Sequence, residues 1–183
     1  MIKAVIDGGP GTGKTSIIKE LKKRGYNVAP EAARIVFHRK KYRDNPSMSK
    51  ARLKEIQKAI WNLSIQEYRS ALKTRKNHIL FFDRGVFSGL SYIILGKMQI
   101  PKTMLEQANL VLYDYVFIPS PLPKRLYIND TIRRESYDKS TQIHKKIIQS
   151  YKKFGYKPIV VPFGTVKQRT DFIMKRIRRD LKI

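Results

Sequence analysis

A phosphate-binding loop is the clearest chemical signal in the sequence. The pattern G-x-x-x-x-G-K-S/T is matched at every fixed position by Gly8-Gly9-Pro10-Gly11-Thr12-Gly13-Lys14-Thr15. Glycines let backbone N–H groups turn toward an anion, and Lys14 is expected to reach the β- and γ-phosphates of a nucleotide. Thr15 is expected to ligate Mg²⁺, and the adjacent Ser16 is grouped with the nucleotide-binding residues.

Two acidic residues follow predicted strands. Asp83 comes directly after the apolar run at residues 79–82, and Glu31 follows the short run at residues 26–29. The carboxyl ends of parallel strands form the edge where open α/β sheets bind ligands. Asp83 is therefore expected to act on Mg²⁺ with Thr15, although it could instead cap the next helix. Glu31 is a candidate functional acid, or a residue that complements a helix dipole.

Two side chains beside these acids are expected to contact substrate. Arg84 follows Asp83 at the same sheet edge and suits bidentate contact with a phosphate. Arg34 lies one helical step beyond Glu31, on the same side of a predicted helix. Gln66, on a long predicted helix at residues 49–76, could also project toward a substrate, the alternative being an ordinary surface glutamine.

Arginines in the second half of the chain are predicted to have two further roles. Arg133 and Arg134 lie in a stretch at residues 120–140 with little periodicity. Such long loops are usually functional, and this one is expected to form a lid that brings both guanidiniums onto a transferring phosphoryl group. The alternative is the start of a solvated helix. Arg169 follows a loop at residues 163–165 and is expected to stack on the nucleotide base.

The elements that would position these residues alternate between strand and helix. Apolar runs predict strands at residues 2–7, 26–29, 79–82, 113–118 and 158–162. Helices are predicted at residues 32–41, 49–76, 86–96, 101–112, 141–154 and 166–181, besides one that follows the loop and ends near Gly25. This alternation indicates an α/β fold built on a parallel sheet. With 183 residues, one domain at residues 1–183 is expected.

The charge of the chain is unusual. Thirty-nine Lys and Arg residues against 14 Asp and Glu residues give a net charge of +25. This excess would suit a polyanionic partner such as nucleic acid, an anionic lipid surface or a phosphorylated substrate. Because the charges are scattered along the whole chain, a simple bias in composition is the alternative. The absence of cysteine, of a signal peptide and of a long apolar run favours a cytoplasmic location.

The motifs together resemble a known family. The P-loop, Pro30-Glu31-Ala32-Ala33-Arg34, Asp83-Arg84-Gly85, Tyr113-Asp114 and Arg133-Arg134-Glu135 resemble the kinase-like P-loop ATPases of the AAA type. This group is related to the nicotinamide-riboside kinase domain and TRPL-translocation-defect protein 14, and more distantly to deoxynucleoside and thymidylate kinases. The resemblance covers nearly the whole chain.

This resemblance implies a P-loop NTPase three-layer sandwich whose five parallel strands run in the order 2-3-1-4-5. It implies phosphoryl transfer from ATP or GTP with Mg²⁺, with Glu31 accepting the proton of the substrate hydroxyl. Asp83 would bind Mg²⁺ or share the base role, Arg84 would hold substrate or phosphate, and Arg133 and Arg134 would be the lid arginines.

Three functions are compatible with these residues. The first is a kinase acting on a nucleoside-, nucleotide- or riboside-like small molecule. The second is a polynucleotide 5′-hydroxyl kinase, suggested by the net charge of +25. The third is a nucleotide-dependent switch with an anionic-lipid or protein partner.

Overall fold

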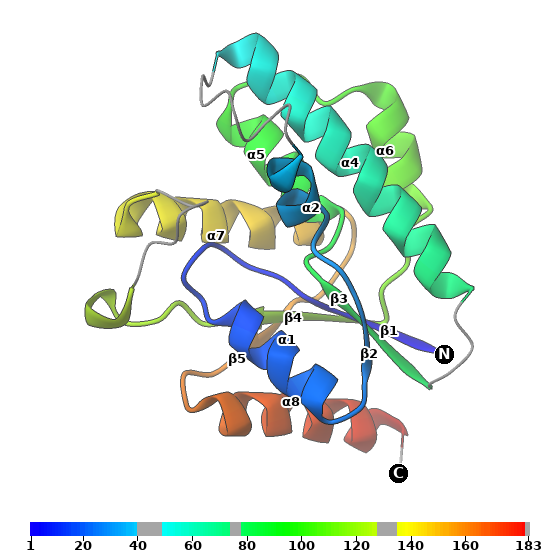
Figure 1. Cartoon of the computed structure of the whole chain (residues 1–183), viewed down its shortest axis with the longest axis vertical. Coiled ribbons are helices and arrows are strands. Elements are labelled where there is room, and N and C mark those ends of the chain that lie inside the picture. Colours follow the sequence, from blue (N-terminus) through cyan, green and yellow to red (C-terminus); the bar gives the residue numbers. More distant parts are fainter. Residues whose placement is uncertain (40–48, 74–77, 128–134, 182–183) are drawn as a thin grey trace.

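A five-stranded parallel sheet forms the centre of the molecule (Figure 1). It is seen in a computed structural model that describes residues 1–39, 49–73, 78–127 and 135–181. The strand order β2-β3-β1-β4-β5 confirms the predicted order. The strands are β1 (Ile2–Ile6), β2 (Asn27–Ala29), β3 (Ile79–Asp83), β4 (Tyr115–Pro119) and β5 (Ile159–Val161).

Helices cover both faces of the sheet, because alternate residues of the central strands are buried on opposite sides. Ala4 and Ile6 of β1 face one core, whereas Val5 faces the other. The first face is covered by α1 (Lys14–Lys23) and α8 (Val166–Leu181), which lie together in Figure 1. The opposite side carries α2 (Ala32–His38), α4 (Lys50–Leu72), α5 (Phe87–Leu95), α6 (Lys102–Asn109) and α7 (Tyr137–Lys153).

The register of the strands brings the predicted site residues to one edge. Ile6 of β1 pairs with Asp83 of β3, and Ala29 of β2 pairs with Phe82. The P-loop that follows β1 and Glu31 that follows β2 therefore leave the sheet beside Asp83.

Some predicted boundaries are wrong, and capping explains the largest shift. Helix α7 begins at Tyr137 rather than at residue 141, because the hydroxyl of Ser136 caps it and accepts a hydrogen bond from the Lys139 N–H at 3.3 Å. The stretch predicted as a lid is thus shorter, with a short 3₁₀ helix η1 (Lys124–Leu126) near its start. Arg133 and Arg134 lie outside the described residues.

The fourth strand begins at Tyr115, two residues later than predicted. Asp114 is held beside β1, where its carboxylate accepts a hydrogen bond from the Lys3 N–H at 2.7 Å. Tyr113 is buried in the core, and its hydroxyl accepts a hydrogen bond from the Val86 N–H at 3.4 Å. Within the described part of the chain, no helix is both long enough and apolar enough to cross a membrane.

Candidate active site

The P-loop adopts the shape that its glycines permit. Gly13 has a φ of 77° and stands at the N-cap of α1, so the helix begins at Lys14. A side chain at this left-handed position would be strained. The ammonium of Lys14 donates to the Gly9 carbonyl at 2.6 Å and to the Thr12 hydroxyl at 3.1 Å. Thr15 and Ser16 are exposed in the first turn of α1, where the helix dipole favours an anion.

Asp7, the residue directly before the P-loop, is fully buried and forms the densest hydrogen-bond cluster of the site. Its carboxylate accepts bonds from the Gly8 N–H at 2.7 Å and from the Gly85 N–H at 3.1 Å. The hydroxyls of Ser88 and Tyr151 also donate to it, at 2.5 and 2.7 Å. Asp7 therefore joins the P-loop to the turn after β3, to α5 and to α7.

The partners of Asp7 are suited to a buried carboxylate because each of them donates. Burial and the Asp7 charge raise the pKa of Tyr151 well above its ordinary value, so this hydroxyl keeps its proton. The sequence analysis did not single out Asp7. Its position next to a phosphate loop was visible, but three of its four partners are far away in the chain.

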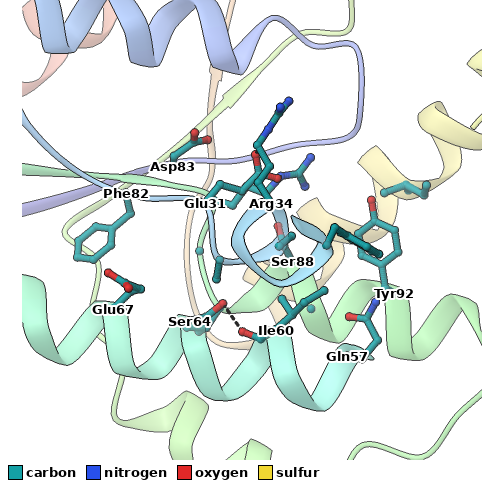
Figure 2. Close-up of a pocket in the computed structure, with 18 of the residues that line it drawn as sticks. Glu31, Arg34, Gln57, Ile60, Ser64, Glu67, Phe82, Asp83, Ser88 and Tyr92 are labelled. Atoms are coloured by element: carbon teal, nitrogen blue, oxygen red, sulfur yellow. Dashed lines mark hydrogen bonds and ion pairs between the residues drawn. The ribbon is translucent and has the colours of Figure 1, made fainter. Parts of the chain in front are cut away.

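Glu31 is buried between two arginines. Its Oε1 lies 2.8 Å from Nε of Arg84, and its Oε2 accepts a hydrogen bond from Nε of Arg34 at 3.0 Å. The Glu31 side chain is only 4% exposed. Although Glu31 is the N-cap residue of α2, its side chain makes no capping hydrogen bond. The carboxylate instead faces the guanidiniums, as Figure 2 shows for Arg34.

Arg84 is held in an unusual backbone conformation. Its φ of 67° lies in the left-handed region, which costs a residue with a side chain about 1–2 kcal/mol. The Arg84 N–H donates to the Ile6 carbonyl at 3.1 Å, and its side chain is 8% exposed. Burial opposes the charge of this guanidinium, but the Glu31 carboxylate and other anionic neighbours raise its pKa above the ordinary value.

A cavity of about 330 Å³ lies beside these residues, within the range of ligand-binding sites. Glu31, Arg34, Asp83 and Arg84 line one side of it. Figure 2 shows Gln57, Ser64 and Glu67 of α4 on the opposite side. The remaining wall is largely apolar and aromatic, and includes Phe37, Leu53, Ile60, Phe82, Tyr92 and Tyr113.

Besides Nε of Arg84, which pairs in charge with Glu31, three polar atoms in the cavity wall are buried and have no hydrogen-bond partner among the described residues. They are Oε1 of Gln57, Nη2 of Arg84 and Oε2 of Glu135. Nε of Arg84 lies 2.8 Å from the Glu31 carboxylate and forms an ion pair with it. This contact is not aligned as a hydrogen bond. Buried polar atoms in folded proteins are usually satisfied, so three such atoms around one cavity indicate a polar ligand.

Gln66 does not line this cavity, and its position agrees with the alternative of an ordinary surface glutamine. Gln66 is exposed and lines a separate shallow depression with Asn62 and Gln107. The cavity instead receives Gln57, which is nine residues earlier in the chain. In a helix of about 3.6 residues per turn, nine residues correspond to two and a half turns, so the two glutamines point in opposite directions.

The assignment of Thr15 and Asp83 to Mg²⁺ stays a prediction, but the structure excludes a capping role for Asp83. Asp83 is the last residue of β3 and lines the cavity, while the N-cap of the following helix is Val86, so Asp83 does not cap it. The described residues contain no cluster of three acids or histidines that could hold a metal. A nucleotide-bound Mg²⁺ needs none, because phosphates and water supply most of its ligands.

Arg169 packs against the outside of the P-loop. Its Nη2 donates to the Ser120 carbonyl at 3.1 Å, and an ideal Cβ at Gly13 would lie 2.7 Å from its Nη1. The side chain is buried, which lowers the pKa of the guanidinium. These contacts support the loop that holds Gly13, and the role of Arg169 in stacking on a base stays a prediction.

His144 of α7 is a second residue that the sequence analysis missed. It is buried, and its Nδ1 accepts a hydrogen bond from the Gly9 N–H at 3.2 Å. Burial and the nearby Lys14 charge lower the pKa of His144 to about 4, against an opposing effect of Asp7. The imidazole is therefore neutral at pH 7, with its proton on Nε2.

The Asp7 cluster predicts a large stability effect from a small substitution. Asp7→Asn replaces one accepting oxygen by an NH₂ group that must face N–H and O–H donors. We expect a loss of about 2–3 kcal/mol in the free energy of unfolding, measured by urea denaturation. Asp114→Asn is the matched control because the Asp114 side chain is 45% exposed, and it should change this free energy by less than about 1 kcal/mol. Equal effects of the two variants would contradict the assigned role of Asp7.

The lowered pKa of His144 predicts part of the pH dependence of folding stability. Its pKa is about 4 in the folded chain and 6.5 ordinarily, so the unfolded chain binds more protons between these values. The stability due to neutral His144 is present above pH 6.5 and is lost as the pH falls toward 4. Urea unfolding from pH 7 to 4.5 should show a shallower decline for His144→Asn than for the wild type. Parallel curves would show that His144 is not held neutral.

Comparisons with known proteins agree with this architecture. A family model described as an AAA domain matches residues 3–169. A solved deoxyadenosine kinase from M. mycoides with bound dATP is similar over 97% of this chain and 100% of its own, at 18% identity and a TM-score of 0.68. NadR protein in complex with NAD and AMP-PNP is similar over 100% of this chain but 50% of its own, at 14% identity and a TM-score of 0.72.

These structural likenesses show the fold, because the identities are low. A comparison with curated proteins finds no match. The family model covers most of the chain, including the P-loop, Glu31 and Asp83. The chain therefore belongs to the family described as an AAA domain, and its P-loop is the nucleotide-binding motif of the chain.

Proposed function

We propose that this protein is a Mg²⁺-dependent phosphotransferase that moves a phosphoryl group from ATP or GTP to a hydroxyl of a nucleoside- or riboside-like molecule. The observation that carries the proposal is the cavity of about 330 Å³ with its three unpartnered polar atoms. An accepting amide oxygen, a donating guanidinium and an accepting carboxylate oxygen suit a compact ligand with both hydroxyl and ring nitrogen groups.

The cavity and the P-loop are close enough to serve one reaction. Gly85, in the cavity wall, donates to Asp7, which directly precedes the loop. Arg84, also in the wall, donates through its backbone to Ile6 of β1. A donor phosphate in the loop and an acceptor in the cavity would therefore meet at the edge of β1 and β3.

Charge in the cavity favours an acceptor without phosphate groups. The described lining residues include four acids, Glu31, Glu67, Asp83 and Glu135, and three bases, Arg34, Arg84 and Lys139. Glu31 is already paired with both arginines, so neither cation is left to balance an additional phosphate. A neutral nucleoside or riboside fits this balance better than a nucleotide does.

Each residue then has a defined task. Lys14 holds the transferring phosphate, and Glu31 orients the acceptor hydroxyl and takes its proton. Arg84 keeps Glu31 in place and offers Nη2 to the acceptor. Thr15 and Asp83 would hold Mg²⁺, which would neutralise phosphate charge when bound. Arg133 and Arg134 stay predicted lid residues.

A polynucleotide or lipid partner is not part of this proposal. A cavity of about 330 Å³ has room for one small molecule, and no comparison points to either partner. The net charge of +25 has no assigned function. A nucleotide switch without an acceptor would leave the three buried polar atoms of the cavity without a purpose.

The direct test is transfer of labelled phosphate from ATP or GTP, with Mg²⁺, to a panel of ribonucleosides, deoxyribonucleosides and other ribosides. We expect a product with at least one of them. Glu31→Gln should lower kcat by about 10²- to 10⁴-fold, because it removes the proton acceptor, and should leave nucleotide affinity nearly unchanged. Glu106→Gln, whose side chain is exposed on α6, is the control with wild-type rates. Tight nucleotide binding without a phosphorylated product from any compound would rule out the proposal.

Gln57 tests recognition of the acceptor separately from chemistry. Gln57→Leu removes the accepting oxygen but keeps an apolar side chain of similar size. We expect the KM for the acceptor to rise about tenfold, with a smaller change in kcat. Gln66→Leu makes the same substitution on the opposite face of α4 and should leave both constants unchanged. If both variants behave alike, Gln57 does not contact the acceptor.

A further inference from the structure

Helix α7 contacts the back of the P-loop at two residues one turn apart. The Ser140 hydroxyl donates to the Pro10 carbonyl at 2.6 Å, and Nδ1 of His144 accepts from the Gly9 N–H at 3.2 Å. All four residues are buried. The helix thus binds two successive residues of the loop, Gly9 through its N–H and Pro10 through its carbonyl, accepting from the first and donating to the second.

Gly9 is also pressed closely against this helix. An ideal Cβ at Gly9 would lie 2.7 Å from the Ser140 carbonyl oxygen and 2.9 Å from Cβ of His144. The P-loop pattern leaves this position open to any residue, so the pattern does not explain its glycine. The close approach of α7 does, because a side chain would have to displace the backbone of a helix.

The same segment holds Lys14. The Gly9 carbonyl accepts from the Lys14 ammonium at 2.6 Å, while the Gly9 N–H is bound to His144. Both polar groups of Gly9 are therefore occupied, one by the lysine that is expected to contact phosphate and one by α7. A shift of Gly9 away from α7 would move the partner of Lys14.

From these contacts we propose that His144 and Ser140 are positioning residues for the nucleotide, which hold the Gly9-Pro10 segment and, through it, Lys14 in the phosphate-binding shape. Neither side chain needs to touch the nucleotide. The essential feature of His144 is a hydrogen-bond acceptor at the position of Nδ1. This inference rests on the nucleotide-binding part of the proposed function, and it does not depend on which molecule receives the phosphoryl group.

Substitutions at His144 can distinguish whether its side chain acts as a hydrogen-bond acceptor or only fills space. In His144→Asn, Oδ1 replaces Nδ1, whereas in His144→Gln the amide lies nearer the place of Nε2. His144→Leu fills the space without any acceptor. A positioning role predicts that Asn works well and that Gln and Leu do not. A packing role predicts the reverse for Asn and Leu, because Leu is closer to His in volume.

The first measurement is hydrogen–deuterium exchange of the P-loop peptide in the nucleotide-free protein, which is independent of the proposed function. We expect faster exchange of the Gly9 amide in His144→Leu and His144→Gln, and wild-type protection in His144→Asn. The second measurement is affinity for Mg·ATP and Mg·GTP by calorimetry. For whichever nucleotide the wild type binds, His144→Leu and His144→Gln should weaken binding about tenfold or more. His144→Asn should weaken it by less than about threefold.

Ser140→Ala provides a second variant that removes only one hydroxyl and is therefore expected to fold. It should weaken nucleotide binding about three- to tenfold, while Gln142→Ala, exposed on the same helix, should have no effect. Unchanged exchange and affinity in a folded His144→Leu, or in Ser140→Ala, would overturn the proposal. So would an Asn variant as weak as the Leu variant. Absence of nucleotide binding by the wild type would refute the proposed function, whereas the exchange pattern would still decide the role of His144.

Discussion

The buried carboxylate of Asp7 is the interaction on which the rest of the site depends. A charge without exposure to water is tolerated only when donors surround it, and Asp7 has donors from the P-loop, the turn after β3, α5 and α7. These four segments meet at one point, so their relative positions are determined together. The phosphate loop and the wall of the cavity are consequently parts of one hydrogen-bonded unit.

The strained turn at Arg84 follows from the same unit. Its left-handed backbone is unfavourable alone, but the bond from its N–H to Ile6 and the bond from the next N–H to Asp7 hold the chain in this shape. The result is a guanidinium aimed at Glu31 rather than at solvent. Strain is retained in proteins where surrounding contacts impose it, and here those contacts place a cation beside the candidate base.

Features of the site that depend on local pattern could be predicted from the sequence. The P-loop, the acids at the ends of β2 and β3, and the parallel sheet all follow from motifs and apolar runs, and the strand order followed from family resemblance. Asp7 and His144 could not be predicted, because all their hydrogen-bond partners except Gly8 lie 78 to 144 residues away. Gln57 was not singled out from the sequence, because periodicity identified a broad apolar face of α4 without showing which of its neighbouring residues would line a cavity.

The helices around the site differ in whether they contact both the cavity and the residues of the phosphate loop, or the cavity alone. On α7, Ile143 lines the cavity while its neighbour His144 binds the P-loop, and on α5 Ser88 lines the cavity and also binds Asp7. A substitution on either helix would disturb both halves of the site. On α4, by contrast, Gln57, Ser64 and Glu67 line the cavity with no hydrogen bond to the P-loop among the described residues. If the proposed function holds, the acceptor preference should therefore be alterable from α4 while the phosphate loop keeps its shape.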